Sequence, residues 1–263
     1  MNVRDLASNI LQKSEDFAEV LSACRTLLKY HPLAEKTREY LDNRISPHYQ
    51  DVFKFGYFPS NENISILTDL VPEKKLRDLG LIYYKKTNDS DCIINVNVGF
   101  LNHHNLIMPY KDSRGNIIAL VGRTILSEQH QKELCIPKYK NTVFYKSLHM
   151  FGLYQAKKSI VNNKSIIIVE GQFDCISCHA HGFHNVVALG GTALSKYQFS
   201  LLRRYTNNIY LLLDTDTAGT NAANKIFNKY SKLANIQKIQ LPKCYKDIDE
   251  YLKKSNDYSV LEL

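Results

Sequence analysis

The sequence lacks any hydrophobic run longer than a β-strand and any regular spacing of cysteines. Residues 1–13 carry charges and have no apolar core of the kind found in export signals. No run approaches the roughly 20 apolar residues that a membrane-spanning helix needs. The six cysteines are scattered along the chain, which is typical of a reducing compartment. The sequence therefore predicts a cytoplasmic protein without membrane association.

Zinc ligands are also scarce. Cys175 and Cys178 lie beside His179, but no second pair of zinc ligands occurs elsewhere. Structural zinc sites need about four such ligands. We therefore expect no zinc.

What is present is enough apolar residues for two modest cores, 44% of 263 residues, and an excess of positive charge. The net charge is +8, and residues 111–158 contribute most to it, with nine Lys and Arg against three Asp and Glu. This basic segment has tyrosines and phenylalanines among its lysines. Such a mixture favours binding to phosphates and unpaired bases, although a merely solvated basic face is the alternative.

Acidic residues follow strand-like runs in the last third of the chain. Ile166 to Val169 lead directly into Glu170, and Asp174 lies four residues later, in the first turn of an expected helix. The run 209–213 ends at Asp214 and Asp216, and Asp247 and Asp249 follow a further strand. Strands alternating with helices predict a parallel sheet, and functional sites form at the carboxyl edge of such sheets. We expect the acids to meet there around a hard cation.

Each acidic motif alone is more typical of a helix cap. Their order and spacing are specific: E-G-x-x-D, then Gly190-Gly191-Thr192, then D-x-D-x-A-G, then Asp247-Ile248-Asp249. This series resembles the TOPRIM fold of DnaG-type primases, topoisomerases and some nucleases, over residues 159–263.

The first half predicts helices and one hairpin. We expect helical structure over 3–30, 33–44 and 64–79, and a short helix that starts at Pro47 and ends at Gly56. Residues 105–122 alternate around a turn and predict a β-hairpin. Residues 126–134 are interpreted as a polar loop.

Motifs in this half resemble the DnaG primase catalytic core. Tyr40-Leu41-Asp42-Asn43-Arg44 followed by Phe55-Gly56-Tyr57 is similar to the family's Y-L-x-x-R and F-x-x-G-Y/F. Residues 108–123 resemble F-P-I-x-D-x-x-G-x-V-I-G-F-x-G-R, and residues 137–154 resemble P-K-Y-x-N-S, F-x-K and L-Y-G-L. The resemblance runs from about residue 33 to the C-terminus.

The resemblance implies an α/β protein that synthesises RNA primers on single-stranded DNA from ribonucleoside triphosphates. It implies three parts: a helical segment (1–32), a basic α+β subdomain (33–158) and a TOPRIM subdomain with a mainly parallel sheet (159–263). Mg²⁺ or Mn²⁺ is the expected cofactor. The expected metal ligands are Asp174, Asp214 and Asp216, extended by Asp247 and Asp249, with Glu170 as a ligand or general base. The expected phosphate-binding residues are Lys111, Arg114, Arg123, Lys138 and Lys146.

The chain departs from the family in having no C-x-x-H…C-x-x-C pattern and no length for a helicase-binding domain. We therefore expect a bare core, as in a phage or mobile-element primase, that depends on a helicase or a separate zinc-binding protein.

Two other functions use the same features. A TOPRIM nuclease would attack DNA with water in place of a 3′-hydroxyl, and a non-catalytic replication factor would only bind nucleic acid. The basic first half disfavours the nuclease. Clustered carboxylates without a metal repel one another, which disfavours the binding factor.

Overall fold

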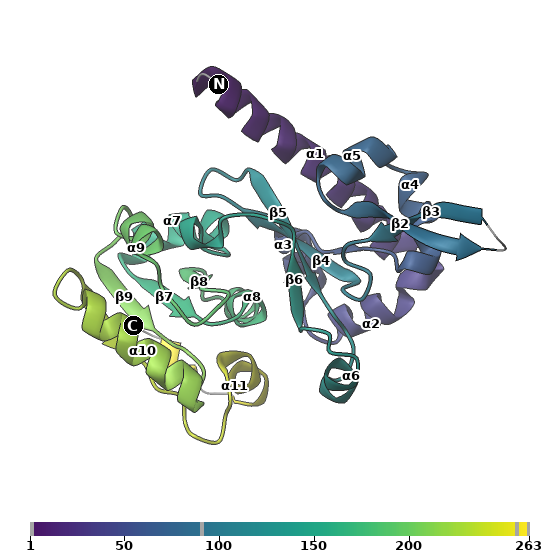
Figure 1. Cartoon of the computed structure of the whole chain (residues 1–263). Coiled ribbons are helices and arrows are strands. Elements are labelled where there is room, and N and C mark those ends of the chain that lie inside the picture. The colour runs from purple at the N-terminus through teal and green to yellow at the C-terminus, as the bar shows by residue number, and fades with distance from the viewer. Residues whose placement is uncertain (1–2, 90–91, 256–257, 262–263) are drawn as a thin grey trace. The chain divides into compact units, whose positions relative to one another are not determined.

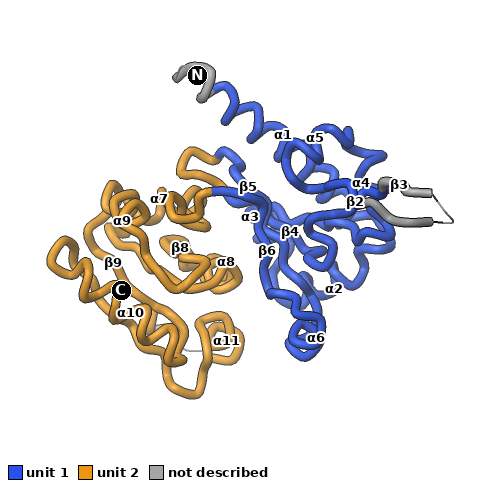
Figure 2. The backbone as a smooth tube through the Cα atoms, in the orientation of Figure 1, with its two compact units in different colours: residues 1–110, 116–144 blue, residues 111–115, 145–263 orange. Residues whose placement is uncertain are grey.

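The computed structural model describes residues 3–89, 92–255 and 258–261. The chain forms two compact units (Figure 2). The first unit comprises residues 1–110 and 116–144, and the second comprises residues 111–115 and 145–263. The tip of one hairpin, residues 111–115, therefore belongs to the second unit, whereas residues 106–110 and 117–123 of its strands belong to the first.

The helices of the first unit come mainly before its sheet. They are α1 (Val3–Tyr30), α2 (Glu35–Asp42), α3 (Pro47–Phe53), α4 (Ser65–Thr68), α5 (Glu73–Asp78) and α6 (Glu128–Glu133) (Figure 1). Short 3₁₀ turns at Pro32–Ala34 and Asn61–Asn63 connect some of them. No helix in the described ranges is both long enough and apolar enough to cross a membrane.

The expected N-terminal helix is confirmed, and it is part of the first unit's core. One face of α1 buries Phe17, Val20, Leu21, Cys24 and Leu28. This face packs on the strands β1 (Gly56–Tyr57) and β5 (Ile117–Arg123). A Cβ atom at Gly56 would lie 2.9 Å from the Cys24 Cβ, so only glycine permits this close approach. Removal of residues 1–30 would expose this core.

The main sheet of the first unit has the strand order β1-β4-β5-β6, where β4 is Leu106–Lys111 and β6 is Tyr139–Asn141. The β1–β4 and β5–β6 pairs are antiparallel. The expected hairpin over residues 105–122 is confirmed as β4 and β5. A separate antiparallel hairpin, β2 (Ile82–Asp89) with β3 (Cys92–Gly99), was not expected from the sequence.

The second unit is built on a parallel sheet of order β10-β9-β7-β8. Its strands are β7 (Ile166–Val169), β8 (Val186–Ala188), β9 (Asn208–Leu211) and β10 (Asn235–Lys238). Its helices are α7 (Leu153–Asn163), α8 (Gln172–Ala180), α9 (Lys196–Leu202), α10 (Thr217–Tyr230) and α11 (Ile248–Lys254) (Figure 1). Short 3₁₀ turns lie at Lys146–Leu148 and Ser259–Leu261. The alternation of strand and helix predicted from the sequence is confirmed.

The helix α7 packs with the second unit. Leu153, Ala156 and Ile160 belong to the same apolar cluster as Ile166 and Ile168 of β7. The compact units therefore separate between residues 144 and 145, whereas the boundary expected from the sequence lies between 158 and 159. The difference arises because α7 buries its apolar face on the parallel sheet.

Two local expectations were wrong. Residues 126–134 contain the helix α6, which Ser127 caps by accepting a hydrogen bond from the His130 amide. The helix α3 ends at Phe53, because Lys54 adopts a left-handed conformation with φ 54°, and Gly56 begins β1. In α6, capping by Ser127 stabilises a helix in a segment with few apolar residues.

Candidate active site

Carboxylates lie at the carboxyl edge of the second unit's parallel sheet. Glu170 directly follows β7, and Asp214 follows the end of β9. These two strands are hydrogen-bonded neighbours, with Ile168 opposite Leu211. The Asp214 backbone also hydrogen-bonds to the Glu170 carboxylate. The two acids that the sequence placed at strand ends are therefore held together by strand pairing.

Three further aspartates lie at the starts of helices. The Asp174 carboxylate accepts the Gly171 amide at 2.8 Å in the first turn of α8. Asp216 caps α10 by accepting the Gly219 amide at 2.8 Å, and Asp247 caps α11 by accepting the Glu250 amide at 2.8 Å. Helix N-termini stabilise negative charge. The capping interpretation and the site interpretation thus apply to the same residues.

Asp249 completes the group. Its side chain is buried and forms a 2.7 Å ion pair with Lys253 of the same helix. The helix α11 packs against α8, and the Asp249 charge acts on the Asp174 carboxyl. Asp249 therefore raises the pKa of Asp174 although it is itself paired with a lysine.

These acids affect one another electrostatically. Burial raises the pKa of Asp174 to about 7, with further increases from Asp247 and Asp214. Burial also raises the pKa of Asp214 to about 7, with contributions from Glu170, Asp247 and Asp216. The pKa of Glu170 is raised by burial, then by Asp216 and Asp174. Perturbed pKa values of this kind are typical of functional sites.

The donor set fits a hard divalent cation. All six side chains offer carboxylate oxygens, which Mg²⁺ and Mn²⁺ prefer. The Glu170 Oε2 atom is buried and has no hydrogen-bond partner among the described residues. In the described ranges no three His, Cys, Asp or Glu side chains are arranged to hold a metal ion together. Neighbouring carboxylates contribute to the raised pKa values of Glu170, Asp174 and Asp214, so these acids repel one another when charged.

The sequence analysis assigned no role to Lys246, which lies close enough to affect the proposed site. Its positive charge lowers the pKa of Asp214, opposing the effects of burial and of the neighbouring acids. Thr215 next to Asp214 holds the same segment, because its amide donates to the Lys246 carbonyl at 2.9 Å. The position of Lys246 immediately before Asp247 was the available signal.

Lys146 is brought to the carboxylate edge. Its Nζ atom donates to the carbonyl of Gly190, in the turn that follows β8. The Gly190 amide in turn donates to the Glu170 carbonyl at 2.8 Å. Burial lowers the pKa of Lys146. Gly190 has a φ of +64° and lies against the Lys146 stem, so a side chain at this turn would displace the lysine.

Lys111 and Arg114 lie at the tip of the β4–β5 hairpin. The Lys111 ammonium is 5.1 Å from the centre of the Tyr154 ring on α7. Arg114 lies in a turn where the Asp112 carboxylate accepts the Arg114 amide at 2.8 Å. Both residues belong to the second unit, as Lys146 does.

Arg123 and Lys138 belong to the first unit and differ in exposure. Lys138 is exposed, whereas Arg123 is only 6% exposed. The Arg123 guanidinium donates to the Tyr40 hydroxyl at 2.9 Å and to the Tyr139 hydroxyl at 2.5 Å. Its donors are therefore directed to side chains of its own unit, which gives it a role in joining α2, β5 and β6.

Replacing Arg123 with alanine is expected to destabilise the first unit. Two tyrosine hydroxyls would lose a charged donor, and hydrogen bonds to charged groups contribute about 1.5–3 kcal/mol. Urea unfolding measures the loss. Arg123→Lys should restore only part of it, because an ammonium lacks the planar fork of donors. Unchanged stability of Arg123→Ala would contradict this structural role.

Gly219 fixes the turn that presents Asp214. A Cβ atom there would lie 2.3 Å from the Asp214 carbonyl oxygen, closer than any real contact. Gly219→Ala is expected to lower the free energy of unfolding by about 1–3 kcal/mol, as overpacking does, and to weaken divalent-cation binding. Asn221→Ala, on the exposed face of the same helix, is the matched control. Calorimetry with Mn²⁺ checks both effects, and normal cation binding by Gly219→Ala would contradict the expectation.

Comparison with known proteins identifies two sequence families. The family described as "DNA primase catalytic core, N-terminal domain" matches residues 25–157, about half of the chain. The family described as "Toprim-like" matches residues 167–252. Its match contains Glu170, Asp174, Asp214, Asp216, Asp247 and Asp249.

Similar proteins are DNA primases. The chain is 34% identical to the DNA primase of Aquifex aeolicus over 221 residues, covering 82% of this chain and 42% of that protein. It is 32% identical to the Synechococcus elongatus DNA primase over 228 residues, covering 80% and 30%. The chain thus spans less than half of the length of these relatives.

Solved primase structures share the fold. The Aquifex aeolicus primase structure with zinc-binding and RNA polymerase domains aligns with a TM-score of 0.76 at 29% identity, covering 95% of this chain and 59% of that one. The E. coli primase catalytic core aligns with a TM-score of 0.76 at 24% identity, covering 95% and 78%. The sequence match over half of the chain settles the family: the chain belongs to the DnaG-type DNA primases.

Proposed function

We propose that this chain is a primase catalytic core that joins ribonucleotides into short primers on single-stranded DNA. The observation that carries the proposal is that Glu170 and Asp214 follow neighbouring parallel strands, and that burial and nearby acids raise the pKa values of Glu170, Asp174 and Asp214. Membership of the DnaG-type family supports the same conclusion. The proposal places the protein in the cytoplasm, where the template is replicated.

The reaction forms a bond between a 3′-hydroxyl oxygen and the α-phosphorus of a nucleoside triphosphate, and it releases pyrophosphate. The hydroxyl must lose its proton. Glu170 suits the role of acceptor, because burial and its acidic neighbours raise its pKa and one of its oxygens has no hydrogen-bond partner among the described residues. A carboxylate with a raised pKa holds a proton more readily at neutral pH.

The remaining acids are proposed ligands for Mg²⁺ or Mn²⁺. Asp174, Asp214 and Asp216 lie nearest the strand ends, and Asp247 and Asp249 extend the set from α11. When bound, such ions supply positive charge that activates the attacking oxygen and stabilises the leaving pyrophosphate. The mutual repulsion of these carboxylates favours capture of a cation.

Basic residues are proposed to bind the phosphates. Lys146 is the strongest candidate for the triphosphate because it already contacts the Gly190 turn beside Glu170. Lys111 and Arg114 on the hairpin tip are candidates within the same unit. For Lys138 the support is its exposure, whereas the burial of Arg123 disfavours direct contact with a ligand.

Lys138→Ala is expected to weaken binding of single-stranded DNA by about 1–3 kcal/mol and to reduce the dependence of affinity on salt by about one counterion. The reason is that an exposed ammonium in contact with a phosphate displaces a bound cation. Fluorescence anisotropy at several salt concentrations measures both quantities. Lys36→Ala, another exposed lysine of the first unit, is the control. Equal affinity and equal salt slope for both variants would show that Lys138 lies on a solvated face.

Partners are proposed on the same basis. The template is single-stranded DNA and the substrates are ribonucleoside triphosphates. A replicative helicase or a separate zinc-binding primase protein is proposed to help the chain select its start site.

Incubation with single-stranded DNA, labelled ribonucleoside triphosphates and Mg²⁺ or Mn²⁺ tests the proposed function. New short oligonucleotides that require the template are the expected product. A parallel reaction without nucleotides, on supercoiled plasmid, examines the nuclease alternative. Nicking of the plasmid with no oligonucleotide synthesis would contradict the primase proposal and favour a nuclease function.

A further inference from the structure

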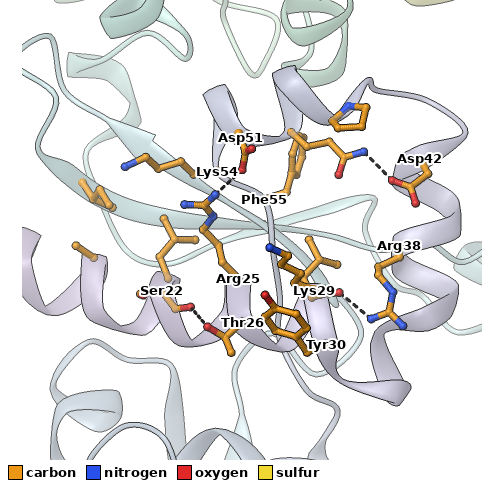
Figure 3. Close-up of a pocket in the computed structure, with 16 residues that line it drawn as sticks. Ser22, Arg25, Thr26, Lys29, Tyr30, Arg38, Asp42, Asp51, Lys54 and Phe55 are labelled. Atoms are coloured by element: carbon orange, nitrogen blue, oxygen red, sulfur yellow. Dashed lines mark hydrogen bonds and ion pairs between the residues drawn. The ribbon is translucent and has the colours of Figure 1, made fainter.

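The first unit contains a cavity that the carboxylate site does not use. It has a volume of about 600 Å³ and lies among α1, α2 and α3 (Figure 3). We refer to it as the α1–α3 cavity. Its size falls in the range of small-molecule sites, roughly 300–1,000 Å³. None of its lining residues belongs to the second unit.

Positive charge predominates in the lining. The cationic side chains are Arg25, Lys29, Arg38 and Lys54, and the acidic ones are Asp42 and Asp51. Arg25 and Lys29 lie four residues apart on α1 and so share one face of that helix. Lys54 reaches the cavity from the end of α3. Two positive charges therefore remain after the acids are counted.

The internal pairing leaves the lysines available. Arg25 forms a 2.6 Å ion pair with Asp51. Arg38 donates to the carbonyls of Leu28 and His31, at 2.8 and 2.9 Å. Lys29 and Lys54 form no ion pair among the described residues. An anion in the cavity could therefore bind the Lys29 and Lys54 ammonium groups without breaking an ion pair between described residues.

The cavity also offers surfaces for a ring. Its apolar lining includes Leu21, Leu28, Phe55 and Ile117, all buried. Tyr30 is 69% exposed, and the Lys29 ammonium lies 5.1 Å from its ring centre. An exposed tyrosine beside a lysine suits stacking of a nucleobase. Ser22 and Thr26 also line the cavity and carry hydroxyl groups.

We propose that the α1–α3 cavity binds a nucleotide, with its phosphates on Lys29, Lys54 and Arg25 and its base on Tyr30 and the apolar lining. This binding is separate from the nucleotide chemistry of the carboxylates. The combination of free cations with an exposed aromatic ring favours a nucleoside phosphate over inorganic phosphate, which would use only the cations. The same chemistry is offered by a free nucleotide and by a nucleotide within a strand. The cavity is partly open, and its volume of about 600 Å³ suits one small molecule, which favours the free nucleotide.

Hydrogen exchange with mass spectrometry tests the proposal on the full chain with ADP in EDTA. EDTA removes divalent cations, so ADP has little reason to bind among the carboxylates. We expect protection of residues 18–30 and 47–55. In the double variant Lys29→Gln and Lys54→Gln, two charge-assisted contacts are lost. The ADP concentration that gives half-maximal protection should therefore rise at least about tenfold. Lys36→Gln, at an exposed lysine outside the cavity lining, should show the same ADP protection as the wild type.

Two further ligands distinguish a free nucleotide from phosphate groups alone and from a nucleic-acid strand. Pyrophosphate should protect the same residues more weakly than ADP, because it lacks a ring. A single-stranded oligonucleotide should not protect them better than ADP. Absence of ADP protection at millimolar concentration, equal protection in the double variant, or protection by the oligonucleotide alone would each overturn the proposal. Circular dichroism of the variants confirms that they remain folded.

Discussion

Asp214→Asn is expected to abolish primer synthesis while leaving the chain folded. Asp214 follows β9, its backbone hydrogen-bonds to the Glu170 carboxylate, and the charge of Glu170 raises the pKa of Asp214. An amide of the same size keeps the packing but removes one anionic oxygen ligand. In metal-free buffer the loss of a repelling charge should leave thermal stability unchanged or raise it. Added Mn²⁺ should stabilise the variant less than the wild type, because ligands stabilise only the state that binds them.

The expected loss of synthesis is several orders of magnitude, measured as labelled oligonucleotide formed per enzyme. Asp216→Asn should behave similarly, although its carboxylate also caps α10 and its loss costs some stability. Asp69→Asn, an exposed acid of the first unit, is the matched control and should retain full synthesis. Wild-type synthesis by Asp214→Asn would refute the assignment of this edge as the active site.

The stability of the metal-free protein is expected to fall as pH rises from about 4 to about 7. In the folded state the pKa of Asp174 is raised from 3.8 to about 7, mainly by burial. Between these values the folded state binds more protons than the unfolded state, so the free energy of unfolding decreases with rising pH. Above pH 7 the decrease levels off. Each unit by which a pKa is raised corresponds to about 1.4 kcal/mol, and solvent reduces the effect at the more exposed Asp214.

Thermal unfolding in EDTA across this pH range measures the effect. Asp174→Asn should flatten the curve, because the buried position then carries no proton equilibrium. Mg²⁺ should restore stability at pH 7 and above, where the carboxylates are charged, and have little effect near pH 5. A metal-free protein that becomes more stable between pH 5 and 7 would contradict the account.

The second unit could be predicted almost completely from the sequence. Four apolar residues before Glu170, and the run that ends at Asp214, are strands because buried parallel strands read as continuous apolar segments. Parallel pairing of β7 with β9 then brings their carboxyl ends together. The order and spacing of the strands and acids therefore predicted the fold, and they place the proposed site at the carboxyl edge of the sheet.

The first unit was less predictable because its features depend on contacts between distant residues. Arg123 resembled a phosphate-binding residue by its motif, yet the hydroxyl groups of Tyr40 and Tyr139 bind it internally. The helix α6 forms in a polar stretch because Ser127 caps it. The α1–α3 cavity combines residues from three separate helices, so no local sequence pattern predicts it.

Crystals of the full chain grown with Mn²⁺ provide the most direct test of the proposed catalytic centre. Anomalous scattering at the manganese absorption edge locates the ion independently of its surroundings. We predict anomalous density among Glu170, Asp174, Asp214 and Asp216, and loss of that density in Asp214→Asn. Strong density elsewhere with none at this edge, in a protein that synthesises primers, would contradict this prediction.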